Sequence, residues 1–337
     1  MAGQVSVLVT GGAGYIGSHA VLALREAGFP VAVVDNFTTG FRWAIPEDVP
    51  VYEGDIADAS LIDRVAADRG IRAIMHFAGS IIVPESVERP LDYYLNNTVK
   101  SRALIESAVR NGIGHFIFSS TAAVYGMPDK VPVDEDAATA PINPYGTSKL
   151  MTEMMLRDVA AAHPINYGAL RYFNVAGADP QGRTGQSTAG ATHLIKIAVE
   201  AAIGKRDSVA VYGTDYPTRD GTGVRDYIHV SDLAEAHVIA LRHLIEHPET
   251  SLTLNCGYSR GFSVLEVLDA VERVSGVTLK RTMAERRAGD APALVSDNRR
   301  ILEMLSWQPR HGNLETIVTH ALAWERLLAA KRDLEAA

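Results

Sequence analysis

Cysteine is almost absent from this chain. Cys256 is the only one in 337 residues, so no disulfide can form within the chain, and we expect a reducing, cytoplasmic location. Long apolar runs are also lacking: no stretch approaches the ~20 residues of a membrane span, and the N-terminus has no signal-peptide layout. Positive charge is in deficit, because the net charge is −8. We therefore expect neither a membrane nor a nucleic acid as a partner.

Metal-ligand patterns are missing as well. The 11 histidines are scattered, and neither a His-Glu-x-x-His run nor a cysteine pair is present, so no metal site is predicted. The composition, 47% hydrophobic and 21% charged, is typical of a globular protein. A length of 337 residues exceeds what one hydrophobic core usually holds, which favours two lobes.

The first motif is Gly11-Gly12-Ala13-Gly14-Tyr15-Ile16-Gly17, which follows a valine-rich run over residues 5–10. The run predicts a buried parallel strand, and the glycines allow a tight turn that brings backbone close to a pyrophosphate at a helix N-terminus. A helix over residues 15–27 and a strand over residues 31–35 are expected next. Asp35 ends that strand, where a carboxylate suits the ribose hydroxyls of NAD and would repel the extra phosphate of NADP.

Strands and helices are then expected to alternate. Strands are predicted over residues 49–52, 73–77, 115–119 and 165–172, and helices over residues 59–69, 90–111 and 144–162. This alternation predicts an α/β fold with a Rossmann-like, doubly wound parallel sheet, whose ligands lie beyond the carboxyl ends of the strands.

The regular alternation of strands and helices ends near residue 174, and the glycine-rich, mixed-polarity sequence that follows predicts a smaller C-terminal α/β lobe. Long loops are expected over residues 176–190 and 214–223. Helices are predicted over residues 192–203, 230–244, 263–274 and 314–334, and strands over residues 209–212 and 252–255. We expect a dinucleotide-binding domain over residues 1–174 and a substrate domain mainly over residues 175–337. Segments near residues 225–258 are candidates to rejoin the first domain, the strand 252–255 in its main sheet.

Tyr145 and Lys149 form the second motif, in Asn143-Pro144-Tyr145-Gly146-Thr147-Ser148-Lys149. Asn143 suits a helix N-cap and Pro144 the first helical position, so the pair should share one face of a helix. An ammonium beside a phenol should lower the tyrosine pKa toward neutrality and make it a base for an alcohol proton. Thr121, at the end of strand 115–119, could bridge the substrate hydroxyl and Tyr145. Alone, each feature is more typical of an ordinary helix face or strand end; with the glycine motif they indicate NAD-dependent alcohol–ketone chemistry.

The chain resembles the extended short-chain dehydrogenase/reductase superfamily, and within it the family of UDP-glucose (UDP-galactose) 4-epimerases, nearly end to end. The segments that carry the resemblance are residues 10–17, 76–79, 93–97, 119–126, 145–149, 171–174, 223–230 and 286–290. The segments Arg171-Tyr172-Phe173-Asn174, 223–230 and 286–290 are the specific ones, whereas the first and fifth mark only the superfamily.

The resemblance implies an isomerase of nucleotide-sugar and galactose metabolism. By this resemblance, Tyr145 would take the proton of the sugar 4-hydroxyl while NAD accepts hydride from carbon 4. The bound 4-keto sugar would then rotate about its link to the diphosphate, and hydride would return to its opposite face. It also implies a homodimer formed through helices 90–111 and 144–162. The implied catalytic residues are Thr121, Tyr145 and Lys149. The implied NAD contacts are Gly11, Gly14, Tyr15, Ile16, Gly17, Asp35, Asn36, Asp55, Ile56, Phe77, Ala78, Gly79, Asn97, Ser119, Tyr145, Lys149 and Tyr172. The implied UDP-sugar contacts are Thr121, Tyr145, Asn174, His193, Leu194, Ala210, Tyr212, Arg225, Arg287, Asp290 and Leu294, with the two arginines on the diphosphate.

Four positions depart from the family pattern. Thr121 replaces a common serine but keeps the hydroxyl, and Ser80-Ile81-Ile82 lacks a lysine that many members carry near the cofactor. His193 replaces a common asparagine, and its alternative interpretation is a helix-start histidine without a ligand. Leu294 replaces a tyrosine that lines the sugar pocket in many bacterial members. The sugar therefore stays open among hexose, pentose and N-acetylated forms.

The residues argue against other functions. A 4,6-dehydratase or decarboxylase would carry carboxylates directly after Thr121, where this chain has Ala122 and Ala123. A simple reductase would release its cofactor in each turnover. An NAD-sensing or scaffold protein would not need Thr121, Tyr145 and Lys149 together. The 4-epimerase is therefore preferred, for UDP-glucose and UDP-galactose first and for another UDP-sugar, an N-acetylhexosamine or a pentose, as the alternative.

Overall fold

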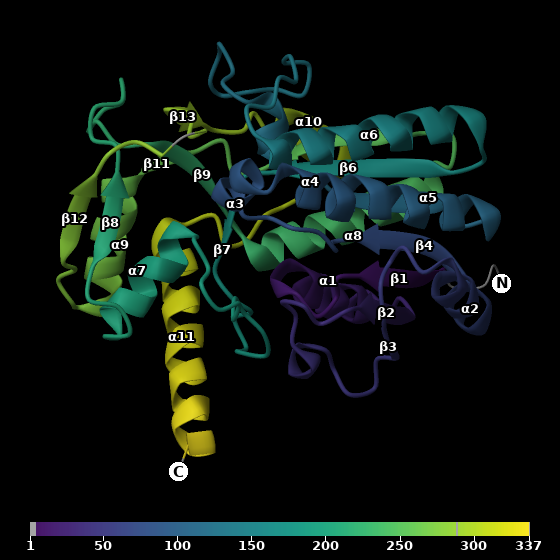
Figure 1. Ribbon diagram of the computed structural model, residues 1–337, viewed down its shortest axis with the longest axis horizontal. Helices are drawn as coiled ribbons and strands as arrows, with labels where there is room; N and C mark the ends of the chain where they lie inside the picture. Colours follow the sequence, from purple (N-terminus) through teal and green to yellow (C-terminus); the bar gives the residue numbers. More distant parts are fainter. Residues whose placement is uncertain (1–4, 288, 337) are drawn as a thin grey trace.

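A seven-stranded, all-parallel sheet forms the centre of the computed structural model, which describes residues 5–287 and 289–336 (Figure 1). The strand order is β10-β6-β5-β4-β1-β2-β3. The strands are β1 (Ser6–Thr10), β2 (Val31–Asp35), β3 (Val51–Glu53), β4 (Ile71–His76), β5 (His115–Ser119), β6 (Asn166–Tyr172) and β10 (Leu252–Cys256). The order reverses beside β1, so the predicted doubly wound, Rossmann-like α/β fold is confirmed.

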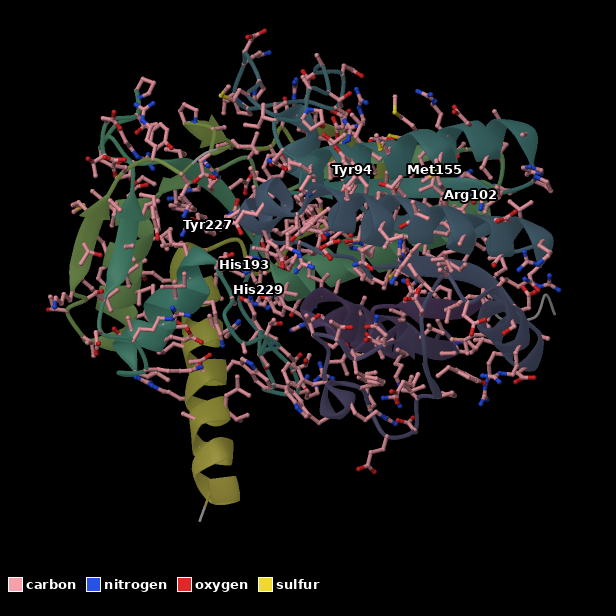
Figure 2. All side chains as sticks on the ribbon, in the orientation of Figure 1. Tyr94, Arg102, Met155, His193, Tyr227 and His229 are labelled. Carbon is pink, nitrogen blue, oxygen red and sulfur yellow. The ribbon has the colours of Figure 1, made fainter. Side chains whose placement is uncertain are left out.

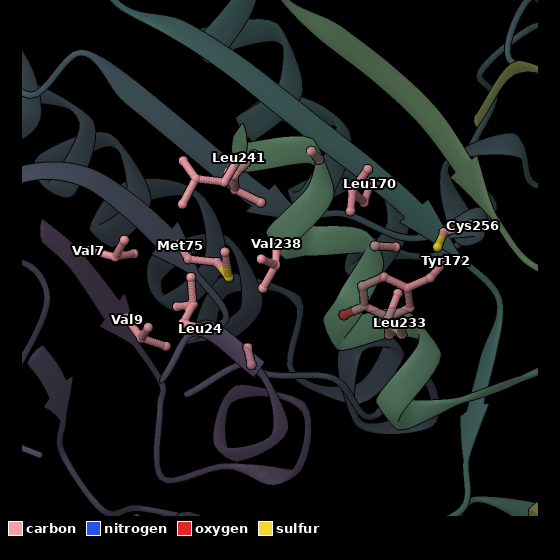
Figure 3. Close-up of a cluster of buried hydrophobic side chains, with 14 of the residues drawn as sticks. Val7, Val9, Leu24, Met75, Leu170, Tyr172, Leu233, Val238, Leu241 and Cys256 are labelled. Carbon is pink, nitrogen blue, oxygen red and sulfur yellow. The ribbon is translucent and has the colours of Figure 1, made fainter. Parts of the chain in front are cut away.

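Alternation of side chains along β1 explains why helices cover both faces. Val7 and Val9 belong to one buried cluster, and Leu8 belongs to another on the opposite face. Helices α1 (Tyr15–Glu26) and α8 (Val230–Glu246) contribute to the first cluster, where Leu24, Leu233, Val238 and Leu241 pack together (Figure 3). The second face is covered by α2 (Ala59–Arg69), α5 (Lys100–Arg110) and α6 (Pro144–Ala162). Each such side chain contributes about 1.5–3 kcal/mol when fully buried.

A smaller lobe lies beside the carboxyl ends of the central strands (Figure 1). Its sheets contain β7 (Asn174–Ala176), β9 (Val224–His229), β11 (Gly261–Ser263) and β13 (Ala293–Leu294), and separately β8 (Val209–Tyr212) with β12 (Arg281–Ala284). Its helices α7 (Leu194–Ala202), α9 (Val264–Ser275) and α11 (Leu314–Ala336) pack around a third apolar cluster. Between β9 and β11 the chain crosses back to the central sheet, where β10 pairs with β6, as predicted.

The long helix predicted over residues 90–111 is interrupted. The structure has α4 (Pro90–Tyr93), a π-helical segment Tyr94–Val99 and then α5. A π segment inside a helix adds a residue to a turn and is frequent at functional sites. The sequence prediction also missed the short elements, whose few residues show no clear period: β7, β9, β11, β12, β13, α3 (Val83–Glu88), α10 (Arg299–Leu305) and the 3₁₀ segments Arg42–Ala44 and Ala122–Tyr125. Among the described residues, no helix is both long and apolar enough to cross a bilayer.

Candidate active site

A cavity of about 1010 Å³ lies between the carboxyl ends of the central strands and the smaller lobe. Its lining joins the glycine-rich turn, the ends of β2, β4 and β5, the start of α6, and segments of β8, β9 and β13. Every cofactor and substrate residue predicted from the sequence lines this cavity except Asn97. Residues that are far apart in the chain are thus brought to one site, at the sheet edge where the fold places ligands.

The glycine-rich turn is shaped to admit a large anionic group. Gly11 has a φ of +71°, and a Cβ at this position would lie 2.5 Å from the backbone nitrogen of Ala78. A Cβ at Gly17 would lie 2.1 Å from the carbonyl oxygen of Gly11. Helix α1 starts directly after Gly14 without a side-chain cap, and its first residues, Tyr15, Ile16 and Gly17, line the cavity, so backbone N–H groups at the helix start can serve a ligand there. This cradle fits the pyrophosphate of a dinucleotide.

Asp35 holds the next part of the cavity wall. Its Oδ2 accepts a hydrogen bond of 2.8 Å from the backbone N–H of Ala13, and its Oδ1 accepts one of 2.8 Å from that of Phe37. The carboxylate therefore fixes the glycine-rich turn against the end of β2 and still lines the cavity. Asp55 lies farther along the same edge, where it accepts from the Lys100 ammonium and from the N–H of Ala57 at 2.9 Å.

Tyr145 and Lys149 are both buried on the first turns of α6. Asn143 caps this helix by accepting from the N–H of Gly146 at 2.9 Å, and Pro144 occupies its first turn, as predicted. The Lys149 ammonium donates to the carbonyl oxygen of Ser119 at 3.0 Å. Its nitrogen also lies 5.0 Å from the ring centroid of Phe118.

Thr121 lies opposite Tyr145 and its side chain is hydrogen-bonded to the tyrosine. The Thr121 oxygen accepts a hydrogen bond of 3.1 Å from the backbone N–H of Ala123. Because that bond occupies the hydroxyl as an acceptor, its proton is free to be donated to Tyr145. Thr121 and Tyr145 can therefore pass a proton between them.

The pKa of Tyr145 differs from the sequence prediction. Burial raises this pKa above the usual value of 10.0, and the hydrogen bond from Thr121 opposes the rise. Burial also lowers the pKa of Lys149 to about 8. The predicted lowering of the tyrosine pKa by Lys149 is thus wrong for the protein alone. Both groups lose water, which disfavours their charged forms, and the lysine directs its proton to Ser119.

The smaller lobe supplies cations to the same cavity. Arg225 on β9 donates to its neighbour's carbonyl, that of Val224, at 2.9 Å, and its Nη2 lies 3.9 Å from a carboxylate oxygen of Asp290. The guanidinium of Arg287 lies 3.8 Å from the ring centroid of Tyr212. Both arginines line the cavity and can bind a diphosphate in a bidentate manner. In the segment 286–290, Ala288 lies outside the described residues.

Comparisons with known proteins agree with this geometry. The model of the NAD dependent epimerase/dehydratase family matches residues 7–257. The chain belongs to this family. A UDP-glucose 4-epimerase of Azospirillum brasilense is 59% identical over 322 residues, which cover 96% of this chain and 92% of that protein.

Solved structures of epimerases are similar over the same length. One is a UDP-glucose 4-epimerase from Bifidobacterium longum in complex with NAD+ and UDP, with a TM-score of 0.91 and 38% identity over 96% of this chain and 98% of that one. Another is the UDP-Glc/GlcNAc 4-epimerase from Campylobacter jejuni, with a TM-score of 0.84 and 45% identity over 96% of this chain and 100% of that one.

Asn97, a predicted cofactor contact, does not line the cavity of this member of the epimerase/dehydratase family but lies behind its wall. It is buried in the π-helical segment, where its Oδ1 accepts from the N–H of Ser80 at 2.7 Å. Its amide nitrogen donates to the carbonyl of Ser80 at 2.9 Å and to the hydroxyl of Ser148 at 3.0 Å. Asn97 therefore ties the loop after Gly79 to helix α6.

His193 lies between the central sheet and the smaller lobe, near Tyr227 (Figure 2). It precedes α7 but makes no side-chain cap bond, and its Nδ1 lies 2.8 Å from the amide nitrogen of Gln186. Burial lowers the pKa of His193, so the ring is neutral at pH 7. Gln186 lines the cavity too, and the sequence prediction missed it because it belongs to the irregular loop over residues 176–190.

Proposed function

We propose that the protein is an isomerase that interconverts UDP-glucose and UDP-galactose through a 4-keto intermediate. The observation that carries this proposal is the buried Tyr145, hydrogen-bonded to Thr121, in one cavity with the glycine-rich turn and two arginines. The 59% identity with a UDP-glucose 4-epimerase supports the choice of reaction. A relative crystallised with NAD+ and UDP supports the choice of ligands.

NAD fits the part of the cavity that the central sheet builds. The glycine-rich turn would hold its pyrophosphate and Asp35 its adenine ribose, because both line the cavity and the turn keeps its tight course only with glycine at positions 11 and 17. Asp55 and Ile56 would contact the adenine, and Ser119 and Tyr172 the nicotinamide half. Bound NAD supplies the reversible hydride acceptor for carbon 4 of the sugar.

The chain's own residues move the proton. Tyr145 acts as the phenolate, which the hydrogen bond from Thr121 stabilises, and it becomes a neutral phenol when it receives the proton of the sugar 4-hydroxyl. The Lys149 ammonium, close to Ser119, provides positive charge at the same end of the cavity. The proton returns to the sugar oxygen in the second half of the reaction, so Tyr145 is restored in every turnover.

The UDP moiety anchors the substrate while the 4-keto sugar rotates to present its opposite face. Arg225 and Arg287 bind the diphosphate, and Asn174 and Asp290 contact the nucleoside. The anchor leaves the sugar attached only through its link to the diphosphate. A cavity of about 1010 Å³ gives room for this rotation. The domain division follows from these roles: residues 1–174 bind NAD, with α8 and β10 added from the returning chain, and residues 175–337 mainly bind the UDP-sugar.

A homodimer is part of the proposal. Exposed apolar side chains cluster on α4, on the π-helical segment and on α6: Leu91, Leu95, Val99, Met151 and Met154. In Figure 2, Tyr94 marks the π-helical segment and Met155 marks α6, and Arg102 marks α5, which continues from the π-helical segment. Pairing two copies through these helices would cover the apolar surface. A cytoplasmic location is proposed on the single cysteine.

A second candidate is the 4-epimerisation of UDP-N-acetylhexosamines. It is favoured by one observation, that Leu294 rather than a tyrosine lines the sugar end of the cavity. Leu294 pairs in register with Arg225 across β13 and β9, and it packs beside Phe173 in a small apolar cluster. The similarity to a UDP-Glc/GlcNAc 4-epimerase supports the same candidate.

The experiment incubates purified protein, without added NAD, with UDP-glucose, UDP-galactose, UDP-N-acetylglucosamine and a UDP-pentose, and identifies the products by NMR. We expect UDP-glucose and UDP-galactose to interconvert with no net NADH release and no metal requirement. Dehydrated or decarboxylated products would refute the assignment. Stoichiometric NADH release would indicate a dehydrogenase instead.

A further inference from the structure

One face of α6 contacts three consecutive residues of the segment after β5. Tyr145 is hydrogen-bonded to Thr121, and Lys149 donates to the carbonyl of Ser119. One helical turn farther on, Glu153 extends the same face, because residues four apart on a helix stand above one another. The first two contacts involve residues of the proposed reaction. The third has no assigned role.

Glu153 contacts Ser120, which lies between Ser119 and Thr121. Its Oε1 accepts the hydrogen bond that the Ser120 hydroxyl donates. Ser120 is fully buried, and its backbone N–H donates to the carbonyl of Leu170 on β6 at 2.9 Å. Ser120 is therefore held at both its backbone and its side chain, directly before Thr121.

Arg171 on β6 fixes the carboxylate in turn. Its Nη2 donates to Oε2 of Glu153 at 2.7 Å and its Nε to Oε1 at 3.0 Å, and both side chains are 8% exposed. The third guanidinium nitrogen, Nη1, donates to the hydroxyl of Tyr125 at 3.1 Å, which donates to Asn255 at 2.7 Å. A bidentate pair of this kind leaves the carboxylate one orientation, toward Ser120.

We propose that Glu153 is a positioning residue for the reaction: through Ser120 it holds the segment 119–121 so that the Thr121 hydroxyl stays directed at Tyr145. This inference rests on the proposed function. The rival explanation is that the Glu153–Arg171 pair only stabilises the fold. A buried ion pair is a weak stabiliser compared with apolar side chains of similar volume, so stability alone does not account for it.

The first test removes the hydroxyl of Ser120. In the variant Ser120→Ala the Glu153–Arg171 pair stays intact, so the charges remain compensated and the fold should be preserved. We expect kcat for UDP-galactose to fall about 10- to 100-fold, as for an active group displaced by ~1 Å, with KM within about twofold. The matched control is Ser107→Ala, which removes another buried hydroxyl, on α5 and away from the cavity, and should leave kcat unchanged.

The pH profile separates positioning from stability. The hydrogen bond from Thr121 lowers the pKa of Tyr145, so weakening it raises that pKa. The acidic limb of kcat against pH should therefore move to higher pH in Ser120→Ala and stay in place in Ser107→Ala. An unmoved limb with unchanged kcat in Ser120→Ala would overturn the proposal.

A second variant replaces the pair itself. Glu153→Met combined with Arg171→Met keeps similar volume without buried charge, so the unfolding temperature should be retained or raised. Positioning predicts the same fall in kcat and the same shift of the pH limb as in Ser120→Ala. A folded double variant with wild-type kcat and pH profile would overturn the proposal. If the wild-type protein itself fails to interconvert the UDP-hexoses, the proposed function fails first, and the two failures are thereby distinguished.

Discussion

Replacing Lys149 by methionine should stabilise the protein near neutral pH while it removes activity. The folded pKa of Lys149 is about 8, against 10.5 for a lysine in water, because burial disfavours the ammonium. A difference of roughly 2.5 units corresponds to about 3 kcal/mol of destabilisation. Losing the hydrogen bond to the Ser119 carbonyl costs about 1–2 kcal/mol in return. We expect Lys149→Met to be more stable than wild type by roughly 1–2 kcal/mol at pH 7.

The dependence on pH tests the cause. The cost of the buried ammonium is fully present below pH 8, because both states are then protonated. Between pH 8 and 10.5 the unfolded state binds more protons than the folded state, so wild-type stability rises with pH. Relative to Lys149→Met, the wild-type free energy of unfolding should therefore increase by about 2 kcal/mol between roughly pH 8 and pH 9.5.

Urea unfolding curves at a series of pH values measure this difference. Both proteins are first stripped of bound NAD, because a nucleotide that binds only the folded state adds its own stabilisation. The matched control is Lys100→Met, which removes a less buried ammonium paired with Asp55. A stability difference between wild type and Lys149→Met that stays constant from pH 7 to roughly pH 9.5 would show that Lys149 is not desolvated as the structure indicates.

Three further variants test the proposed reaction. Tyr145→Phe keeps the ring and loses the proton acceptor, so initial rates with UDP-galactose should fall about 10²–10⁴-fold, while calorimetry should show UDP binding almost unchanged; near-full activity would refute the proton path. Arg225→Met removes a cation from the diphosphate site, and calorimetry should show UDP binding weakened by about 1.5–3 kcal/mol, with NAD retention as the control that must not change. Leu294→Ser should raise, and Leu294→Tyr lower, the ratio of UDP-N-acetylglucosamine to UDP-glucose activity, by about 1–3 kcal/mol in discrimination; one ratio for all three proteins would show that Leu294 is not the gate.

The parts of the fold and site that the sequence predicts correctly are local in the chain. The glycine-rich turn needs one strand, one turn and one helix, and all three are encoded between residues 6 and 26. The start of α6 is set by Asn143 and Pro144, next to the tyrosine that it presents. The segments 223–230 and 286–290 carry a resemblance that no periodicity reveals. Their placement at one cavity follows once the smaller lobe folds over the sheet.

Features that depend on irregular loops, on pairing between strands or on a local break in the helical period escape such prediction. The pairing of Gln186 with His193 depends on how an irregular loop meets the start of α7. Strand β13 has two residues and exists because it pairs with β9, so no window of sequence indicates it. The π-helical segment is likewise invisible to a period of 3.6 residues, although it sets the position of Asn97 behind the cavity wall.

The sequence predicts the wrong direction for the pKa of Tyr145, because that pKa depends on burial rather than on spacing. The tyrosine stands four positions before Lys149 as the motif requires, yet burial disfavours the phenolate and the ammonium alike. Of the effects that act on the tyrosine within the described part of the chain, the hydrogen bond from Thr121 is the one that favours the phenolate. The orientation of Thr121 therefore decides how readily Tyr145 accepts a proton. That orientation depends on Ser120, whose hydroxyl is bound by Glu153.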